Sequence, residues 1–417
     1  MNNKAKQTTG KKAGQSALTP KLRFPEFRAG PAWEETILSS VLTEHGETDD
    51  GASEVHSVSV HKGVINQVEH LGRSYAAEDR SNYNLAKPHD VIYTKSPTGD
   101  FPWGVVKQNR LPYNVIVSPL YGVFSPVNRH LGYILDAYFE SPVRTTNYLA
   151  PITQKGAKNT IQISNATFLS KGLYLPSIEA EHKKIAECLN SVDELIAAEA
   201  RKLDTLKTHK NGLMQELFPR EGETQPRLRF PEFHAAPEWE VKNLGIVAKN
   251  LNNRRVPITA SERVAGDVPY YGASGIVDYV EGYIFDEDLL CVSEDGANLV
   301  ARTYPIAFPI SGRTWVNNHA HILKFENSCT QKFVEVYLNS IKLDDFITGM
   351  AQPKLNKAML DSIPIPHPRV SEQQRIANCL TTLDDLIAAQ TQKLAALKTH
   401  KQGLMQQLFP SPDEIEV

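Results

Sequence analysis

A stretch of 35 residues occurs twice in this chain of 417 residues, and this repeat constrains the fold more than any other feature. Residues Ile185–Pro219 and Ile376–Pro410 align without a gap and are identical at 23 of the 35 positions. A shorter repeat, LRFPEF, begins at Leu22 and again at Leu228. The segments between these repeats, roughly 40–170 and 245–360, show no comparable similarity. Because an internal repeat decides the architecture of a chain, this sequence consists of two halves with repeated framing segments and different contents.

The long repeat predicts a helix with a narrow apolar stripe. Spacings of four and three residues alternate along the stripe, which is typical of a coiled-coil seam. Both copies end at Leu-Phe-Pro, and Ser177 and Ser371 are the expected N-caps. Each helix should have about 40 residues and a length of roughly 60 Å. The stripe consists of Ile185, Leu189, Val192, Ile196, Leu203, Leu206, Leu213 and Leu217 in the first copy, and of Ile376, Leu380, Leu383, Ile387, Leu394, Leu397, Leu404 and Leu408 in the second.

Two seam positions are polar in each copy, and they favour an antiparallel pair of helices. A parallel pair would place Lys210 beside Lys401, which are like charges. Polar seam residues commonly specify register at a cost in stability. The alternative is that both lysines extend to solvent and specify nothing. The antiparallel register that we predict forms the pairs Glu199–Lys401, Lys210–Gln390, Leu203–Leu397 and Leu206–Leu394.

The composition is that of a globular protein, with 41% hydrophobic and 22% charged residues. No apolar run approaches the ~18–20 residues that a membrane span needs. Residues 1–20 are polar and lack the apolar core of a secretory signal, so we expect a disordered tail there. The four cysteines, at positions 188, 291, 329 and 379, show no metal-ligand spacing. We therefore expect a reduced, cytoplasmic protein without a structural metal ion.

The net charge of −3 argues mildly against a nucleic-acid partner, because proteins that bind phosphates usually carry a basic surface. The charges are unevenly distributed, however. Residues 101–175 contain seven Lys and Arg against two Asp and Glu, whereas residues 250–365 contain ten against fourteen. The first variable segment can supply a basic face from its composition alone, but the second requires its charges to be sorted in space.

Both variable segments combine short β-branched and aromatic runs with Gly, Pro and Asn, which indicates a β core with scattered short helices. Val91–Thr94 and His321–Phe325 are predicted strands. Leu131–Phe139 and Gln331–Ile341 are predicted helices. Both segments should therefore be α/β mixtures.

The order of variable segment, helix, variable segment and helix resembles the specificity subunits of type I restriction–modification systems. The resemblance covers nearly the whole chain beyond the tail. Each LRFPEF opening is followed by a tryptophan, and a Glu-x-x-x-Ile-Ala approach precedes each helix after Pro176 and Pro368. The segments Asp90–Gly104 and Leu289–Val300 resemble the strand-and-loop cores of target recognition domains in that family.

This resemblance implies a non-catalytic subunit without a cofactor, in which two α/β (α+β) target recognition domains are joined by two long antiparallel coiled-coil helices. The implied boundaries are 21–175 and 220–367 for the domains, 176–219 and 368–410 for the spacer helices, and 411–417 for a C-terminal tail. Each domain would recognise one half of a split target in double-stranded DNA. Because the domains differ, the target should be asymmetric. The helices would dock two methyltransferase subunits, which in turn bind restriction and translocation subunits.

Loops of both domains carry side chains suited to DNA. Arg and Lys suit guanine, Asn and Gln suit adenine, and Ser and Thr suit phosphate oxygens. The alternative for any one of these residues is that it only supports its own loop, because such loops occur on every soluble protein. The candidates are Lys95, Ser96, Thr98, Lys107, Asn109, Arg110, Lys155, Lys158 and Asn159 in the first domain, and Tyr271, Ser274, Asn298, Arg302, Arg313, Thr314, Asn317, Asn318 and Lys354 in the second.

Enzyme motifs are not found in this sequence. The closest match to an amino-methyltransferase signature, Leu111-Pro112-Tyr113, lacks the amide and one proline, and no GxxxxGK[ST] phosphate loop occurs. The acidic pairs Asp193-Glu194 and Asp384-Asp385 are expected on the solvent side of the helices. Two alternatives stay open: a two-headed scaffold that binds proteins, and a specificity subunit that supports methylation without restriction.

Overall fold

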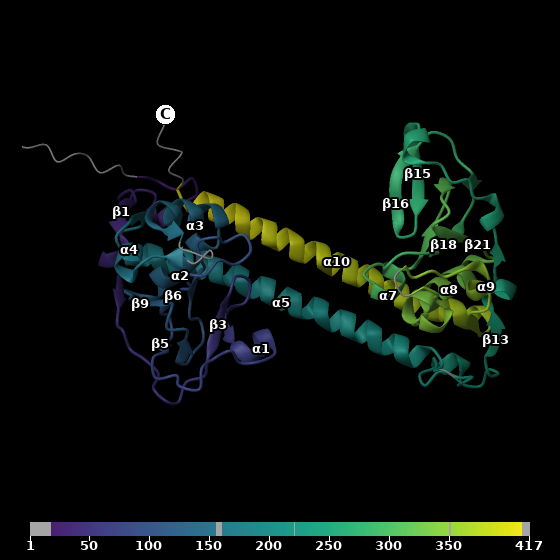
Figure 1. The fold of residues 1–417 in the computed structure, drawn as a ribbon, viewed down its shortest axis with the longest axis horizontal. Coiled ribbons are helices and arrows are strands. Elements are labelled where there is room, and N and C mark those ends of the chain that lie inside the picture. Colours follow the sequence, from purple (N-terminus) through teal and green to yellow (C-terminus); the bar gives the residue numbers. More distant parts are fainter. Residues whose placement is uncertain (1–17, 156–160, 221, 350–351, 411–417) are drawn as a thin grey trace, which may run out of the picture. The chain divides into compact units, whose positions relative to one another are not determined.

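The computed structural model describes residues 18–155, 161–220, 222–349 and 352–410. Most of the tail expected at residues 1–20, and all of the tail expected at 411–417, lie outside these ranges. The described chain forms two compact units, which we call the first unit (18–198 and 394–410) and the second unit (199–393). Each unit contains one variable segment together with part of both long helices (Figure 1).

The repeat forms the two long helices that its pattern predicts. Helix α5 (Glu179–Leu217) and helix α10 (Val370–Leu408) have 39 residues each. The predicted N-caps are wrong, because α5 begins two residues after Ser177 and α10 begins one residue before Ser371. Neither Ser177 nor Ser371 is therefore the residue directly before its helix.

The two helices are antiparallel within each unit, as predicted. In the first unit, Ile185 near the start of α5 shares a hydrophobic core with Leu408 at the end of α10. In the second unit, Leu217 at the end of α5 shares a core with Ile376 near the start of α10. The leucines of the predicted pairs lie on the buried side of their helices: Leu203 is buried, and Leu206, Leu394 and Leu397 are partly buried.

The predicted register is wrong. Lys210 contacts Asp384 at 2.5 Å in the second unit, and Lys401 contacts Asp193 at 2.7 Å in the first. These pairs occupy equivalent positions of the repeat, and their acids are the ones that we expected on the solvent side. A seam of alternating spacings looks nearly the same after a shift of about seven residues, so the apolar pattern alone does not separate neighbouring registers. Because Lys401 is buried, it does not extend to solvent.

Glu199 and Gln390 also have different partners from the predicted ones. They occupy the same position of the repeat and contact each other, since the Gln390 Nε2 donates to Glu199 Oε2 at 2.6 Å and to the Glu199 carbonyl at 3.0 Å. The Lys393 ammonium donates to Glu199 Oε1 at 2.5 Å. The hydrogen bonds from Lys393 and Gln390 lower the pKa of Glu199.

The first variable segment folds around a four-stranded antiparallel sheet, in the order β2-β9-β6-β7, on which helix α2 packs. Val91, Ile92 and Tyr93 are all buried because β6 lies between β9 and β7. The predicted strand and helix of this segment are confirmed as β6 and α2. The elements are β1 (Glu34–Ile37), β2 (Leu42–Glu44), β3 (His56–Ser59), β4 (Gly63–Asn66), α1 (Gln67–Leu71), β5 (Asn84–Ala86), β6 (Val91–Tyr93), β7 (Val106–Gln108), β8 (Val115–Val117), β9 (Gly122–Pro126), α2 (Arg129–Phe139), α3 (Pro142–Leu149), β10 (Gln154–Lys155), β11 (Ile161–Gln162), α4 (Asn165–Leu169) and β12 (Gly172–Leu175).

The second variable segment contains two four-stranded sheets, β14-β21-β18-β19 and β16-β15-β20-β17. Helix α8 packs on strands β18 and β19 (Figure 1). The predicted strand at His321–Phe325 and helix at Gln331–Ile341 are confirmed as β21 and α8. The elements are β13 (Glu240–Asn243), α6 (Leu244–Val247), β14 (Lys249–Asn250), β15 (Ala265–Gly272), β16 (Gly275–Val280), β17 (Phe285–Asp286), β18 (Leu289–Ser293), α7 (Asn298–Ala301), β19 (Ala307–Ile310), β20 (Arg313–Val316), β21 (Ala320–Lys324), α8 (Ser328–Ser340), α9 (Lys357–Asp361) and β22 (Pro364–His367).

One sheet is common to both units although their sequences differ. Strand β9 lies between β2 and β6, just as β21 lies between β14 and β18. Phe124 pairs with Val91 in the first sheet, and Leu323 pairs with Leu290 in the second. Counting along the strands from these pairs, Lys95 at the end of β6 is equivalent to Glu294 at the end of β18. The same scaffold therefore carries opposite charges at this position.

The helices that follow these sheets are capped in the same way. The Asn128 side chain accepts a hydrogen bond from the Leu131 amide at 2.9 Å at the start of α2. The Asn327 side chain accepts from the Thr330 amide at 2.7 Å at the start of α8. Asparagine is among the most favourable N-cap residues, because its oxygen satisfies an amide that has no partner within the helix.

The short repeat joins each domain to the start of a long helix. In the first unit the Arg23 guanidinium forms two hydrogen bonds of 2.8 Å with Glu181 of α5, and both side chains are buried. In the second unit Arg229 binds Glu372 of α10 in the same way, at 2.7 and 2.8 Å. Two parallel N–H···O bonds fix the orientation of both groups. The arginine of LRFPEF and the glutamate of the helix approach are therefore partners.

Candidate nucleic-acid interface

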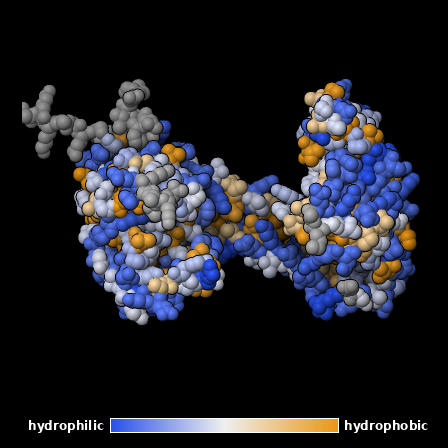
Figure 2. Space-filling view, in the orientation of Figure 1, coloured by the Kyte–Doolittle hydropathy of each residue, from blue (hydrophilic) through white to orange (hydrophobic). Residues whose placement is uncertain are grey.

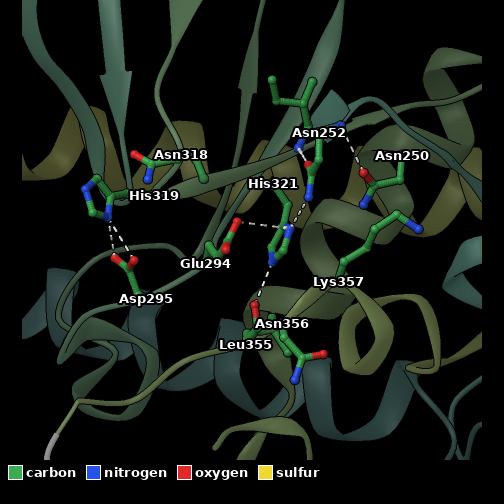
Figure 3. Close-up of polar contacts among 12 residues, drawn as sticks. Asn250, Asn252, Glu294, Asp295, Asn318, His319, His321, Leu355, Asn356 and Lys357 are labelled. Atoms are coloured by element: carbon green, nitrogen blue, oxygen red, sulfur yellow. Dashed lines mark hydrogen bonds and ion pairs between the residues drawn. The ribbon is translucent and has the colours of Figure 1, made fainter. Parts of the chain in front are cut away.

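The loops that carry Tyr271, Ser274, Asn317 and Asn318 meet the end of β18 at one edge of the sheets of the second domain. The Ser293 hydroxyl donates to the Ala273 carbonyl at 2.5 Å, which ties the end of β18 to the β15–β16 turn. The backbone N–H of Asn317 donates to the Tyr271 carbonyl at 3.0 Å. We call this region the strand-end site and define it as residues 271–274, 293–296, 317–319 and 353–355 (Figure 3).

Backbone hydrogen bonds hold the strand-end site together. The Glu294 amide donates to the His319 carbonyl at 2.9 Å, and the Leu355 amide donates to the Glu294 carbonyl at 2.8 Å. The Gly296 amide donates to the Pro353 carbonyl at 3.1 Å. Loops held this way present their side chains in fixed positions, which recognition of a ligand requires. Tyr271, Ser274, Asn317, Asn318 and Lys354, all predicted from the sequence, lie in or beside this region.

Glu294 is the centre of the charges beneath this surface. It contacts Arg255 at 2.6 Å and Lys354 at 3.4 Å. Burial alone would raise the pKa of the Glu294 carboxyl, but the hydrogen bond from Arg255 and the charges of Arg255 and Lys354 lower it overall. Glu294 therefore stays ionised and neutralises cations that would otherwise face a phosphate.

His321 has a structural role in the same region. Its Nε2 donates to the Leu355 carbonyl at 2.7 Å, and its Nδ1 accepts from Asn252 at 2.8 Å (Figure 3). The side chain is fully buried, and burial lowers its pKa. The imidazole is therefore neutral and serves to join β21 to the loop before α9.

His319 and Asp295 form an exposed pair at the edge of the strand-end site. The His319 Nδ1 lies 2.8 and 3.0 Å from the two Asp295 oxygens (Figure 3). The His319 side chain is 51% exposed and that of Asp295 is 31% exposed. Both residues are therefore accessible to a ligand although they are hydrogen-bonded to each other.

Four predicted DNA-contact residues of the second domain have other roles. Asn298 binds the backbone of Tyr304 through both its amide nitrogen and its oxygen. Arg302 donates to the carbonyls of Leu338 and Ile341 at the end of α8. Thr314 is fully buried, and Arg313 lies over the Tyr283 ring at the start of β20, whereas the strand-end site lies beyond the end of that strand. Asn317 is in the site but is itself buried, and its oxygen accepts from the His319 amide at 2.8 Å.

In the first unit, Lys95 lies beside a small polar cleft of about 140 Å³. Its backbone has a φ of 51°, which is uncommon for a residue other than glycine and is often found at functional sites. Burial lowers the pKa of the Lys95 ammonium, and Glu44 opposes part of this shift. Asn165 donates to Glu44 at 2.6 Å on the same cleft. Lys95 is thus half-buried, and its ammonium is stabilised by the carboxylate of Glu44.

Three predicted contact residues of the first domain are bound to other groups of the protein, and two of them, Lys107 and Asn109, are buried. Lys107 and Arg110 contact Asp136 at 3.1 and 2.8 Å, and Asp136 is almost fully buried. Asn109 is fully buried and donates to the carbonyls of three neighbouring loop residues. The DNA-contact prediction is wrong for Lys107 and Asn109, since both are enclosed, and Arg110 is occupied by carboxylates. Loop composition does not reveal which cations have an internal partner.

The other candidates of the first domain are placed less fully. Ser96 is half-buried and donates to the Thr94 carbonyl at 3.2 Å, and Thr98 is exposed in a tight turn with Phe101. Lys155 ends strand β10. Lys158 and Asn159 lie outside the described residues.

Sequence reasoning missed Glu44, Asn165, Arg255, Asp295 and His319 as site residues. Asp295 and His319 lie near the predicted residues Asn298 and Asn318 in sequence, but our selection favoured cations, amides and hydroxyls. The signal for them was their place directly after a strand, where loops of one sheet edge gather. Glu44, Asn165 and Arg255 are far from those loops in sequence, and only the fold brings them near.

Within the described ranges, His, Cys, Asp and Glu side chains form no cluster that could hold a metal ion. Over the same ranges, every helix is too short or too polar to cross a membrane.

Comparison with known proteins identifies relatives of this chain. Residues 237–399 match the family model described as the type I restriction modification DNA specificity domain. A Haemophilus influenzae protein named as a type I restriction enzyme specificity subunit is 39% identical over 149 residues, which are 36% of this chain and 38% of that protein. A Methanocaldococcus jannaschii protein named as the MjaX type I restriction enzyme specificity subunit is 27% identical over 269 residues, 61% of this chain and 62% of that protein. The matches thus span less than two thirds of the length of these curated relatives.

The fold has a counterpart among solved structures. The S subunit of a type I restriction–modification system from M. genitalium matches with a TM-score of 0.59, over 94% of this chain and 100% of that chain, at 16% identity. At that identity the match indicates a common fold. The duplicated helices, the sheet common to both units and the family match at residues 237–399 agree: this chain contains the type I restriction modification DNA specificity domain and has the fold of a solved specificity subunit of that kind of system.

Proposed function

We propose that this chain is the DNA-recognition subunit of a type I restriction–modification complex in the cytoplasm, and that it binds a bipartite, asymmetric target. Residues 21–175 and 220–367 would each recognise one half-site in double-stranded DNA. Residues 176–219 and 368–410 would act as spacers between the domains. The family match and the loops that gather at the strand-end site support this assignment.

The observation that carries the proposal is the common sheet with different loops. Strands β2, β9, β6 and β7 correspond to β14, β21, β18 and β19, yet the strand ends present Lys95 in one domain and Glu294 with Asp295 in the other. Lysine suits the acceptors of guanine, whereas carboxylates suit the amino group of cytosine. The two half-sites should therefore differ in sequence.

The long helices are the proposed docking surface for two methyltransferase subunits, one for each copy of the repeat. Packing between the helices explains why buried seam positions are identical in the two copies, but it does not explain identity at exposed positions. Leu195 and Leu386 are equivalent, and they are 43% and 49% exposed. Lys207, Thr208 and His209 are exposed and recur as exposed residues at 398–400. Identity at exposed positions supports one kind of partner that binds twice, and restriction and translocation subunits would join through it.

The proposed function is tested by reconstitution with methyltransferase subunits and sequencing of the methylated DNA. We expect one split motif whose two halves differ. A complex that forms but methylates DNA without any sequence preference would contradict the proposal and favour a protein-binding scaffold. The result does not depend on whether a restriction subunit is present.

The docking surface is tested separately. We expect the double variant Leu195→Arg and Leu386→Arg to lose both methyltransferase subunits in native mass spectrometry, and each single variant to lose one. Ala395→Arg, at an exposed position that differs between the copies, is the control and should keep both. Retention of two subunits by the double variant would place the docking surface elsewhere.

A further inference from the structure

The Asp295–His319 pair has a defined proton arrangement. Both Asp295 oxygens lie within hydrogen-bond distance of the His319 Nδ1. An ionised carboxylate only accepts hydrogen bonds, so Nδ1 must carry a hydrogen. In the neutral imidazole the other nitrogen, Nε2, is then an acceptor. Since half of the side chain is exposed, His319 can offer this acceptor to a ligand.

The backbone on both sides of the pair is fixed. The His319 amide donates to Asn317 Oδ1 at 2.8 Å, and the His319 carbonyl accepts from the Glu294 amide at 2.9 Å. Asp295 forms a β-bridge with Lys354. A polar group held this way loses little conformational entropy when it binds, which favours selective recognition.

The charges around the pair oppose a phosphate contact. Glu294 and Asp295 lie side by side, and the cations that face Glu294, Arg255 and Lys354, are already paired with it. A phosphate or the acceptor edge of guanine would meet negative charge here. An amino group would meet an acceptor beside a negative charge, which strengthens its hydrogen bond.

We propose that His319, positioned by Asp295, is a specificity-determining residue that accepts a hydrogen bond from the exocyclic amino group of adenine or cytosine in the major groove. These amino groups, N6 of adenine and N4 of cytosine, are the donors that distinguish base pairs there. The inference rests on the proposed function, because it assigns one base pair within the half-site that the second domain recognises. The corresponding strand end of the first domain carries Lys95, so that domain should not share this preference.

The first arm of the test compares methylation motifs. Reconstituted complexes with His319→Ala should accept other bases at one base pair of one half-site, with discrimination there reduced roughly 10- to 100-fold. The other half-site should be unchanged. Asp295→Asn should reduce discrimination at the same base pair, because an amide can accept from or donate to Nδ1 and so no longer fixes the imidazole tautomer. His61→Ala, an exposed histidine of the first domain, is the control and should leave the motif intact.

The second arm uses the unaltered protein and DNA that lacks the amino group at that base pair. Purine in place of adenine, or 2-pyrimidinone in place of cytosine, should reduce binding by the unaltered complex but not that by the His319→Ala complex. The base that shows this dependence decides between adenine and cytosine. If the His319→Ala complex does not assemble, the Asp295→Asn complex takes its place in this comparison.

The outcomes separate this inference from the proposed function. A complex that methylates a split motif which His319→Ala leaves unchanged would refute the role of His319 alone. Equal loss of binding by both complexes on the altered DNA would also refute it. So would the finding that the base pair at which His319→Ala loses specificity is recognised only through the acceptors of guanine. A complex without sequence preference would refute both proposals.

Discussion

Asp136 is a buried carboxylate that binds two cations in the first unit. Its side chain is 2% exposed and contacts Lys107 and Arg110. Burial would raise the pKa of Asp136, but these two cations lower it overall. Arg110 also contacts Asp193 of α5 at 3.1 Å, and Asp193 contacts Lys401 of α10. A chain of charges therefore connects the first domain to both helices.

We expect Asp136→Asn to destabilise the first unit by about 3–5 kcal/mol, because it leaves the enclosed ammonium of Lys107 without its carboxylate and removes one of the two carboxylates that bind Arg110. Hydrogen exchange of peptides from α2 should report the change, and peptides from α8 should be unaffected. Glu187→Gln, which alters an exposed pair with Lys183, is the control, and its effect should be within about 0.5 kcal/mol. Unchanged exchange in α2 would mean that the charges contribute little.

The same residue predicts an acid limit to stability. A carboxyl whose pKa is lower in the folded state stabilises the protein above its unfolded pKa, which is about 4, and this contribution is lost as the pH falls through the folded value. We expect protection of α2 to decrease as the pH falls below about 4. Asp136→Asn should remove most of that pH dependence, and an equally steep decrease in the variant would assign it to other groups.

At the scale of the elements, the paired helices combine a predictable direction with an unpredictable register. The apolar stripe and the like charges of Lys210 and Lys401 sufficed to predict antiparallel helices. The register depended on Asp193 and Asp384, which the helical pattern had led us to expect on the solvent side of the helices. Whether such a residue faces its partner helix or solvent depends on how the domains pack at the helix ends, and a helical pattern contains no information about that.

The candidate site divides in the same way. Strand ends and their loops could be predicted, because β-branched runs and glycines mark them, and in the second domain these loops do converge. The choice of residues within loops was poorer. Lys107, Asn109 and Arg302 have the residue types of a DNA contact, but they bind partners distant in sequence, and Lys107 and Asn109 are buried as well.

The pair formed by Glu199 and Gln390 leads to a prediction for the helices. Gln390→Glu would place two carboxylates at the same point of the seam, where one amide now donates to one carboxylate. We expect a loss of roughly 1–2 kcal/mol in thermal unfolding, which Glu199→Gln in the same chain should restore. Gln402→Glu, on an exposed position, is the matched control. Equal stability of Gln390→Glu and the starting chain would show that Lys393 neutralises both acids.

At the scale of the whole molecule, the distribution of charge limits what the chain can do alone. Of the ten Lys and Arg at residues 250–365, eight lie within salt-bridge distance of a carboxylate. In Figure 2, hydrophilic and hydrophobic residues alternate over the visible face of each unit, and apolar side chains are also exposed along the long helices. The second domain therefore offers little free positive charge to a phosphate backbone.

We expect the isolated chain to bind DNA weakly, with affinity that depends little on salt, because few phosphates are neutralised. Adding methyltransferase subunits should increase both the affinity and the slope of log K against log salt concentration, by about 0.9 for each added phosphate contact. Titrations by fluorescence anisotropy at salt concentrations from about 50 to about 300 mM would measure this slope, with a scrambled duplex as the control. Tight, steeply salt-dependent binding by the chain alone would contradict the expectation.

The Glu199–Gln390 contact affects which helices pair with each other. Two neighbouring nascent chains each expose both helices, and exchange of equivalent helices is a low-cost route to an unwanted dimer. If α5 paired with α5 of another chain in the same register, two glutamates would meet at this point, and if α10 paired with α10, two glutamines would meet without a charged partner. A single difference between the two copies thus makes each helix prefer the other copy to a second copy of itself, and it disfavours dimers formed by like helices.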